Sequence, residues 1–258
     1  MMKEEARRLA LHSGGVIIRG RVLFPVGANG VPLVILCHGI PSGKPVEGDP
    51  GYEALARRFL EGGAACCIFN FRGTGESDGN FSLPGWVQDL SAVLEASLSA
   101  AGPFRGCDPE RVSLVGFSGG GAVSIVCAAR RPGLRALASL SSPSDFSRLI
   151  PREGIGAFIT HARDIGIIRD PDYPASEEEY YREIHSCRPV EEVAGVAPTP
   201  LLIVHGDRDD TVPVQEAYLL YEAAKDPKEL FIVPGGGHKL RLDDRAVEKT
   251  VAWILERA

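Results

Sequence analysis

The sequence has no long apolar run and no concentration of positive charge, and these two absences exclude two classes of protein. No apolar stretch approaches the roughly 20 residues that a membrane-spanning helix requires. Basic residues occur at most in adjacent pairs, and 28 Lys and Arg against 34 Asp and Glu give a net charge of −6. Because nucleic-acid-binding proteins present a basic face to phosphates, we expect no membrane span and no nucleic acid partner.

The sequence also lacks a visible secretory signal and any C-x-x-C pair. Its amino-terminal residues carry both charge signs and lead into no hydrophobic segment, so we expect a cytoplasmic protein. The spacing of the cysteines does not match that of zinc ligands, so we expect no zinc site. Four of the six cysteines lie in apolar runs. The six are predicted to be buried, reduced thiols: Cys37, Cys66, Cys67, Cys107, Cys127 and Cys187.

Short apolar runs rich in β-formers alternate with amphipathic helical segments, which is typical of an α/β fold with a mostly parallel sheet. Several runs, such as 201–204, are continuously apolar and are expected to be covered on both faces. We predict one domain over 1–258, with a sheet of about eight strands flanked by helices. The expected strands are 15–24, 32–37, 64–71, 112–116, 134–140, 200–205 and 229–233, and the expected helices are 52–60, 86–99, 120–129, 214–224 and 245–257.

One interval, from about 144 to 188, interrupts this alternation and contains no convincing strand. We call it the insertion. Its Ser176-Glu177-Glu178-Glu179 run has the form of a capping box and predicts the start of a short helix. A connection of this length within a compact domain is typical of a lid or binding loop. The aromatic residues of the insertion could line a pocket or anchor a lid, and the sequence leaves both options open.

The strongest chemical signal is a G-x-S-x-G run, in which an apolar strand over 112–116 leads through Ser118 into a helix of small residues. This pattern predicts a nucleophile elbow, with Ser118 in a strained turn and with Gly116 and Gly120 where a side chain would collide with backbone. The N–H of Gly119, at the positive end of the helix, would face the charge that develops in acyl transfer.

A serine nucleophile needs a base and an acid that orients the base, and candidates for both follow strands further along the chain. The run His205-Gly206-Asp207-Arg208-Asp209-Asp210 follows one predicted strand, and three glycines followed by His238 come after another. The carboxyl ends of parallel strands meet at one edge of a sheet, where such sites are built. His238 is the expected base.

With these motifs, almost the whole chain resembles the α/β-hydrolase superfamily. The elbow, the H-G-x-x-D-x-x-V-P run and G-G-G-H all match. The resemblance implies an α/β-hydrolase fold and places the acid on Asp209. Asp207 is expected to fix its loop through backbone N–H groups, and Asp210 to face solvent.

The loop after the second predicted strand, Cys37-His38-Gly39-Ile40-Pro41, is expected to complete an oxyanion hole. Since Pro41 has no N–H, Ile40 is the natural second donor beside Gly119, as the resemblance also implies. His38 is expected to shape the turn and not to act as a base.

The run 70–79 resembles the D-x-R-G-x-G-x-S segment of similar hydrolases, which braces the neighbouring oxyanion loop. Here Asn70 stands in the place of the usual Asp, which should weaken a contact to Arg72. We expect a structural role for this run, since Asp78 replaces the last glycine of a phosphate-binding pattern.

The resemblance implies a serine hydrolase with a Ser118, Asp209 and His238 triad, no metal and no organic cofactor. It is greatest to small carboxylesterases of the feruloyl (cinnamoyl) esterase-like and dienelactone hydrolase-like groups, although the latter carry Cys at the elbow. The expected partner is a small-molecule ester, and the oligomeric state is left open, with a homodimer as one option. Three alternatives stand beside the esterase: a prolyl-oligopeptidase-like peptidase, for whose usual propeller the chain has no room, a thioesterase or acylglycerol lipase, and a non-catalytic binding protein.

Overall fold

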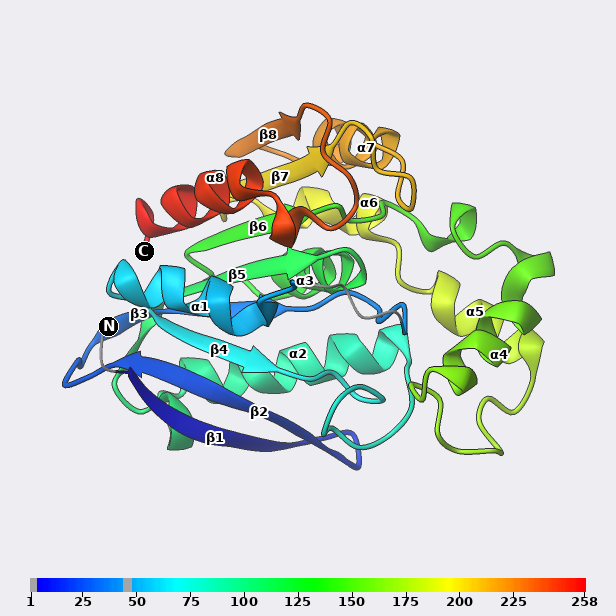
Figure 1. The fold of residues 1–258 in the computed structure, drawn as a ribbon, viewed down its shortest axis with the longest axis horizontal. Helices are drawn as coiled ribbons and strands as arrows, with labels where there is room; N and C mark the ends of the chain where they lie inside the picture. The colour runs from blue at the N-terminus through cyan, green and yellow to red at the C-terminus, as the bar shows by residue number, and fades with distance from the viewer. Residues whose placement is uncertain (1–3, 44–47) are drawn as a thin grey trace.

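The strands form one sheet that is parallel from β4 to β8 (Figure 1). The computed structural model describes residues 4–43 and 48–258, so residues 1–3 and 44–47 of the predicted domain lie outside it. The strand order is β1-β2-β4-β3-β5-β6-β7-β8, with β1 and β2 antiparallel. The strands are β1 (Glu4–Ser13), β2 (Val16–Pro25), β3 (Val31–Cys37), β4 (Ala65–Phe69), β5 (Cys107–Phe117), β6 (Ala136–Leu140), β7 (Leu201–Gly206) and β8 (Lys228–Val233).

The predicted mostly parallel sheet of about eight strands is confirmed, and all seven predicted strand segments lie in it. The sequence analysis missed β1, which pairs with β2 along its whole length. Only Leu9 and Ser13 of β1 are buried. An edge strand that faces water on most of its surface needs no apolar run. Residues 4–13 carry charges of both signs and no such run, so the sequence contains no strand signal there.

Helices cover both faces of the sheet, as the continuously apolar strands predicted. Leu33 and Ile35 of β3 belong to a core with α2, α3 and α7, whereas Val34 and Leu36 belong to a second core with α1 and α8. The alternation of side chains along β3 produces this division. The helices are α1 (Gly51–Glu61), α2 (Leu83–Leu98), α3 (Gly119–Arg130), α4 (Ile155–Asp164), α5 (Glu177–His185), α6 (Pro189–Glu192), α7 (Gln215–Ala223) and α8 (Asp244–Leu255).

The insertion between β6 and β7 adds α4 and α5 but no sheet strand, as expected (Figure 1). The predicted cap is present, since the Ser176 Oγ accepts a hydrogen bond from the Glu179 N–H at 3.1 Å. In Figure 1, α4 and α5 lie beyond the carboxyl ends of the parallel strands, to the right of the sheet. The insertion therefore stands at the end of the sheet where the polar motifs emerge.

A buried ion pair joins the loop after β4 to α2. The Arg72 guanidinium lies 2.7 Å from Asp89 Oδ1, and the Arg72 N–H donates to Asp89 Oδ2 at 2.8 Å. The Asp89 side chain is 0% exposed and that of Arg72 is 12% exposed. Asn70 in place of the usual Asp therefore does not leave Arg72 without a carboxylate.

Replacing Asp89 with alanine should lower the free energy of unfolding by about 3 kcal/mol, because the Arg72 charge would stay buried without its partner. Urea denaturation of the two proteins would measure the loss. The matched control is Glu53→Ala, which removes an exposed carboxylate from Arg21 and Arg57 and should cost less than about 1 kcal/mol. An equal loss in both variants would contradict the role assigned to the buried pair.

Candidate active site

Ser118 occupies a strained turn between β5 and α3. Its φ of 51° and ψ of −124° lie in a region that non-glycine residues rarely adopt, and its N–H donates to the Leu140 carbonyl at 2.8 Å. A Cβ atom at Gly120 would lie 2.6 Å from the Cys37 carbonyl oxygen, and one at Gly116 would lie 2.7 Å from Ser124 Oγ. The predicted need for glycine at both positions is confirmed, and the turn lifts Ser118 out of the strand.

The structure brings Ser118, His238 and Asp209 into one row. The His238 Nε2 lies 3.1 Å from Ser118 Oγ, and the His238 Nδ1 lies 2.8 Å from Asp209 Oδ2. These contacts join the loops after β5, β8 and β7. Each distance is within hydrogen-bond range, so His238 can accept the Ser118 proton while its other nitrogen donates to Asp209.

Of the three neighbouring aspartates, only Asp209 reaches His238 among the described residues. Asp207 Oδ1 accepts a hydrogen bond from the Gly235 N–H at 2.6 Å, which agrees with the loop-fixing role predicted for it. The Asp210 side chain is exposed and lies 3.3 Å from Thr211 Oγ1. The carboxylate that the resemblance selected is therefore the one beside the imidazole.

Asp209 is held as a carboxylate. Burial by itself would raise its pKa, but hydrogen bonds from His205, His238 and the Val212 N–H together outweigh burial and hold the pKa well below its usual range. The Thr211 and Val212 N–H groups both donate to Oδ1, at 2.9 and 2.8 Å. Oδ2 is left to face His238, so the carboxylate is fixed in orientation as well as in charge.

Gly119, the residue after Ser118, packs against Ile40 of the loop after β3. A Cβ atom at Gly119 would lie 2.9 Å from Ile40 Cγ1 and 3.7 Å from the Ile40 nitrogen. Within residues 4–43 and 48–258, neither N–H donates a hydrogen bond. Two unused donors, of which Gly119 stands at the positive end of the α3 dipole, can stabilise a negative oxygen.

His38 shapes the loop that carries Ile40, as predicted. Its Nε2 accepts a hydrogen bond from the Phe71 N–H at 3.2 Å, and its Nδ1 lies 2.8 Å from the Gly39 carbonyl oxygen. Burial lowers the pKa of His38 below its usual value, despite the opposing bond to Gly39. An accepting Nε2 and a donating Nδ1 describe a neutral imidazole that ties β3 to the loop after β4.

The run 70–79 has the bracing role expected of it. Thr74 Oγ1 lies 3.1 Å from His38 Nε2, which joins the run to the oxyanion loop. Arg169 of the insertion donates to the carbonyls of Ser77 and Gly75 at 2.8 and 3.0 Å. The run therefore connects the oxyanion loop with the insertion.

The aromatic side chains of the insertion anchor it to the body of the protein. Tyr173 and Tyr180 both direct their hydroxyls to the Phe81 carbonyl, at 3.4 and 3.3 Å, and the ring of Phe158 lies 5.9 Å from that of Phe81. Ile165 of the insertion lies beside Gly43, two residues after the oxyanion loop: a Cβ atom at Gly43 would lie 3.1 Å from Ile165 Cβ. The sequence analysis missed Ile165 because a single aliphatic residue carries no chemical signal.

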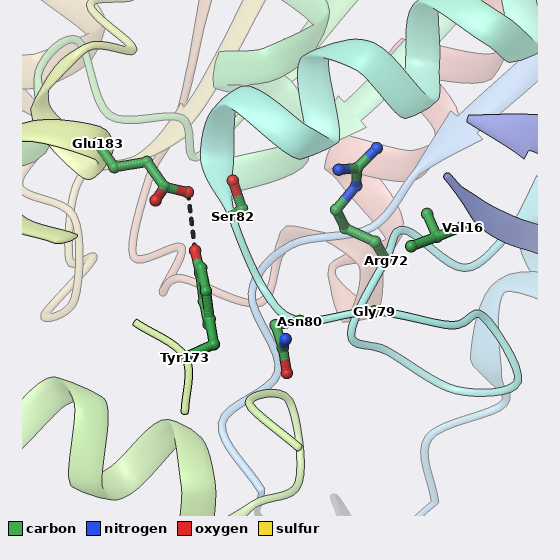
Figure 2. Close-up of a pocket in the computed structure, with 7 residues that line it drawn as sticks. All are labelled: Val16, Arg72, Gly79, Asn80, Ser82, Tyr173 and Glu183. Atoms are coloured by element: carbon green, nitrogen blue, oxygen red, sulfur yellow. Dashed lines mark hydrogen bonds between the residues drawn. The ribbon is translucent and has the colours of Figure 1, made fainter. Parts of the chain in front are cut away.

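A hollow of about 220 Å³ lies between the insertion, the segment 72–82 and the first residue of β2. Its lining residues are drawn in Figure 2. Tyr173 donates to Glu183 across one side of it at 2.8 Å, and Arg72 and Val16 lie on the other side. None of the residues that line it belongs to the row of Ser118, His238 and Asp209. This hollow is therefore separate from the candidate active site.

The thiols of the protein take no part in this site. All six cysteines are free and buried, as predicted, and burial raises the pKa of Cys37 and of Cys127 to about 12. A protonated, buried thiol is neither a nucleophile nor a metal ligand. In the described part of the chain, no group of three or more His, Cys, Asp or Glu side chains is arranged to hold a metal ion.

No helix within the described ranges is both long enough and apolar enough to cross a membrane.

Known proteins resemble this chain in sequence and in fold. A sequence profile described as the prolyl oligopeptidase family matches residues 54–258. The uncharacterised protein YfhR of Escherichia coli K12 is 29% identical over 180 residues, which cover 69% of this chain and 54% of YfhR. This chain thus spans about half the length of the first curated relatives that it matches.

Two further comparisons cover nearly complete proteins. A monoacylglycerol lipase of Mycolicibacterium smegmatis is 25% identical, with 86% of this chain and 88% of the lipase covered. The crystal structure of Est1E from Butyrivibrio proteoclasticus with bound ferulic acid superposes with a TM-score of 0.71 at 23% identity, over 96% of this chain and 98% of Est1E. The fold is that of the α/β-hydrolases, as the sequence resemblance implied.

Proposed function

The chain belongs to the prolyl oligopeptidase family of α/β-hydrolases, and on this premise we propose that it is a serine hydrolase that cleaves carboxylic esters through a covalent acyl-enzyme. The observation that carries the proposal is the row in which His238 Nε2 lies 3.1 Å from Ser118 Oγ and His238 Nδ1 lies 2.8 Å from Asp209. This arrangement supplies a nucleophile, a base and an orienting acid.

In the proposed reaction, Ser118 Oγ attacks the ester carbonyl carbon while His238 Nε2 takes the hydroxyl proton. Asp209 holds the His238 Nδ1–H and stabilises the imidazolium that forms. His238 then returns the proton to the leaving alkoxide, and the acyl group stays on Ser118. In the second half, His238 removes a proton from water, and the hydroxide attacks the acyl carbon. When the bond to Ser118 Oγ breaks, His238 returns the proton to Oγ and the acid leaves.

The N–H groups of Gly119 and Ile40 are proposed to bind the oxyanion of both tetrahedral intermediates. The Ile40→Pro variant removes one donor, and kcat should fall by about 100- to 1,000-fold. Steady-state kinetics of this variant should be compared with those of Ile40→Ala, which keeps the N–H and should retain most of the activity. If the two variants lose activity equally, the side chain of Ile40 matters and its N–H does not.

We propose a small-molecule ester as the substrate, supported by the names of two similar proteins, a monoacylglycerol lipase and an esterase with bound ferulic acid. In this proposal the insertion is a lid within a single domain. Ile165, beside Gly43 at the end of the segment that carries Ile40, would then contact the substrate. Amide or peptide cleavage is the second candidate, because the matching family is that of a peptidase.

The test is hydrolysis of p-nitrophenyl esters from acetate to palmitate, with a ferulate ester and a p-nitroanilide included, by the wild-type protein and by Ser118→Ala. We expect ester hydrolysis that the variant lacks, and the preferred chain length will separate a short-acyl esterase from a lipase. Hydrolysis of the anilide alone would support the peptidase. Failure to cleave any substrate, together with failure of Ser118 to react with a fluorophosphonate, would support a binding protein.

A further inference from the structure

A second histidine, His205, contacts the same carboxylate as His238. It lies near the end of β7, four residues before Asp209, and the side chains of both residues are 0% exposed. The His205 Nε2 lies 2.8 Å from the Val212 carbonyl oxygen and 3.3 Å from Asp209 Oδ2. Oδ2 is the oxygen that also faces His238 Nδ1, so the two imidazoles meet on one carboxylate oxygen.

The neighbours of His205 determine its tautomer. A carbonyl oxygen and an ionised carboxylate oxygen can only accept hydrogen bonds, so Nε2 must carry the proton. The other nitrogen, Nδ1, is buried and has no hydrogen-bond partner among the described residues. A second proton on Nδ1 would make the ring a buried cation whose Nδ1–H has no acceptor, and burying such a group costs free energy. His205 is therefore a neutral imidazole that donates through Nε2.

We propose that His205 is a positioning residue that fixes the Asp209 turn and, by donating to Oδ2, weakens His238 as a base. The first effect follows from the Val212 carbonyl, because the N–H of Val212 donates to Asp209 Oδ1 at 2.8 Å. His205 thus holds the turn whose amide orients the carboxylate. The second effect follows because each donor to Oδ2 withdraws negative charge that would otherwise stabilise the His238 imidazolium. This inference rests on the proposed function, in which His238 is the catalytic base.

The charged groups on the elements packed against β7, and those near His238, either have partners of their own or are exposed to solvent. Among the neighbours of Asp209 other than His238, His205 is therefore the one best placed to change the charge on the carboxylate. The pairs are Glu216 with Arg148, Glu229 with Lys249, Arg245 with Asp243, Lys228 with the carbonyls of Tyr221 and Ala224, Asp207 with the Gly235 N–H, and Arg241 with Asp49. The exposed residues are Arg208, Asp210, Glu222, Lys239, Asp244 and Glu248.

The test compares His205→Leu with His205→Gln, whose amide nitrogen can take the place of Nε2. For His205→Leu we expect kcat to fall by about 10- to 100-fold, because the variant loses one hydrogen bond to the charged carboxylate that orients His238. KM should change little, because the buried ring does not face substrate. The acid limb of the kcat/KM profile should move to higher pH by about half a unit or more, because Asp209 would carry more charge. His205→Gln should restore most of kcat and the wild-type profile.

A second readout does not depend on turnover. Titration of the His238 ring by ¹⁵N NMR should give a higher pKa in His205→Leu than in the wild-type protein, and an unchanged pKa in His205→Gln. The matched control is His185→Leu in the insertion. His185 also has a buried nitrogen without a partner among the described residues, but its Nδ1 donates to the Tyr181 carbonyl and not to Asp209. His185→Leu should leave the His238 titration unchanged.

The proposal is wrong if His205→Leu leaves the His238 titration and the pH profile unchanged, or if His205→Gln is as impaired as His205→Leu. If His205→Leu does not fold, His205→Asn replaces it, because its shorter amide cannot reach the Val212 carbonyl. A wild-type protein that hydrolyses no ester or amide would overturn the proposed function, whereas the NMR titration would still decide the role of His205.

Discussion

Replacing Ser118 with alanine should abolish hydrolysis, with a fall in kcat of about 10⁵- to 10⁶-fold. Ser118 Oγ is the atom that His238 Nε2 faces at 3.1 Å, and water in its place would not be held for attack. Alanine keeps the Cβ atom and adds no strain to the turn at φ 51°, so the fold should be retained. Initial rates on the best ester of the panel and near-UV circular dichroism would measure the two effects.

The control for this variant is Ser99→Ala, which removes an exposed hydroxyl at the end of α2. It should keep the wild-type rate, and it should still react with a fluorophosphonate, whereas Ser118→Ala should not. A folded Ser118→Ala protein with near-normal kcat would show that another group is the nucleophile.

The second large effect is expected for Asp209→Asn, which should lower kcat by about 10⁴-fold. The amide oxygen of asparagine would still accept from Thr211 and Val212, which leaves its NH₂ group facing His238 Nδ1. His238 would then turn to the tautomer that accepts at Nδ1 and carries the proton on Nε2. In that state it cannot remove the proton of Ser118.

The same substitution at the two neighbouring aspartates provides the control. Asp207→Asn keeps an oxygen that can accept from the Gly235 N–H, and Asp210→Asn changes an exposed side chain, so each should cost less than about tenfold in kcat/KM. If Asp207→Asn were the most impaired of the three variants, Asp209 would not be the acid and the loop after β7 would have to be reassigned.

The sequence by itself determined the features that depend on local pattern. Continuously apolar segments predicted the buried parallel strands, and the elbow was predicted because Gly116 and Gly120 stand where the chain must turn sharply beside other backbone. The capping box predicted the start of α5. Such signals are readable because each structure requires particular residue types at fixed short spacings. Strand β1 was missed because an exposed edge strand imposes no such requirement.

Apart from Ser118, Asp209 and His238, which the resemblance to the α/β-hydrolases had grouped, only the tertiary structure decided which distant groups meet. It placed Asp89 of α2 against Arg72, brought three aromatic side chains of the insertion to Phe81 and brought Ile165 to Gly43. It also placed His205 on the carboxylate that faces His238. A buried polar group must find a partner, but that partner is set by how strands and helices pack, and the sequence interval between the two groups says nothing about it.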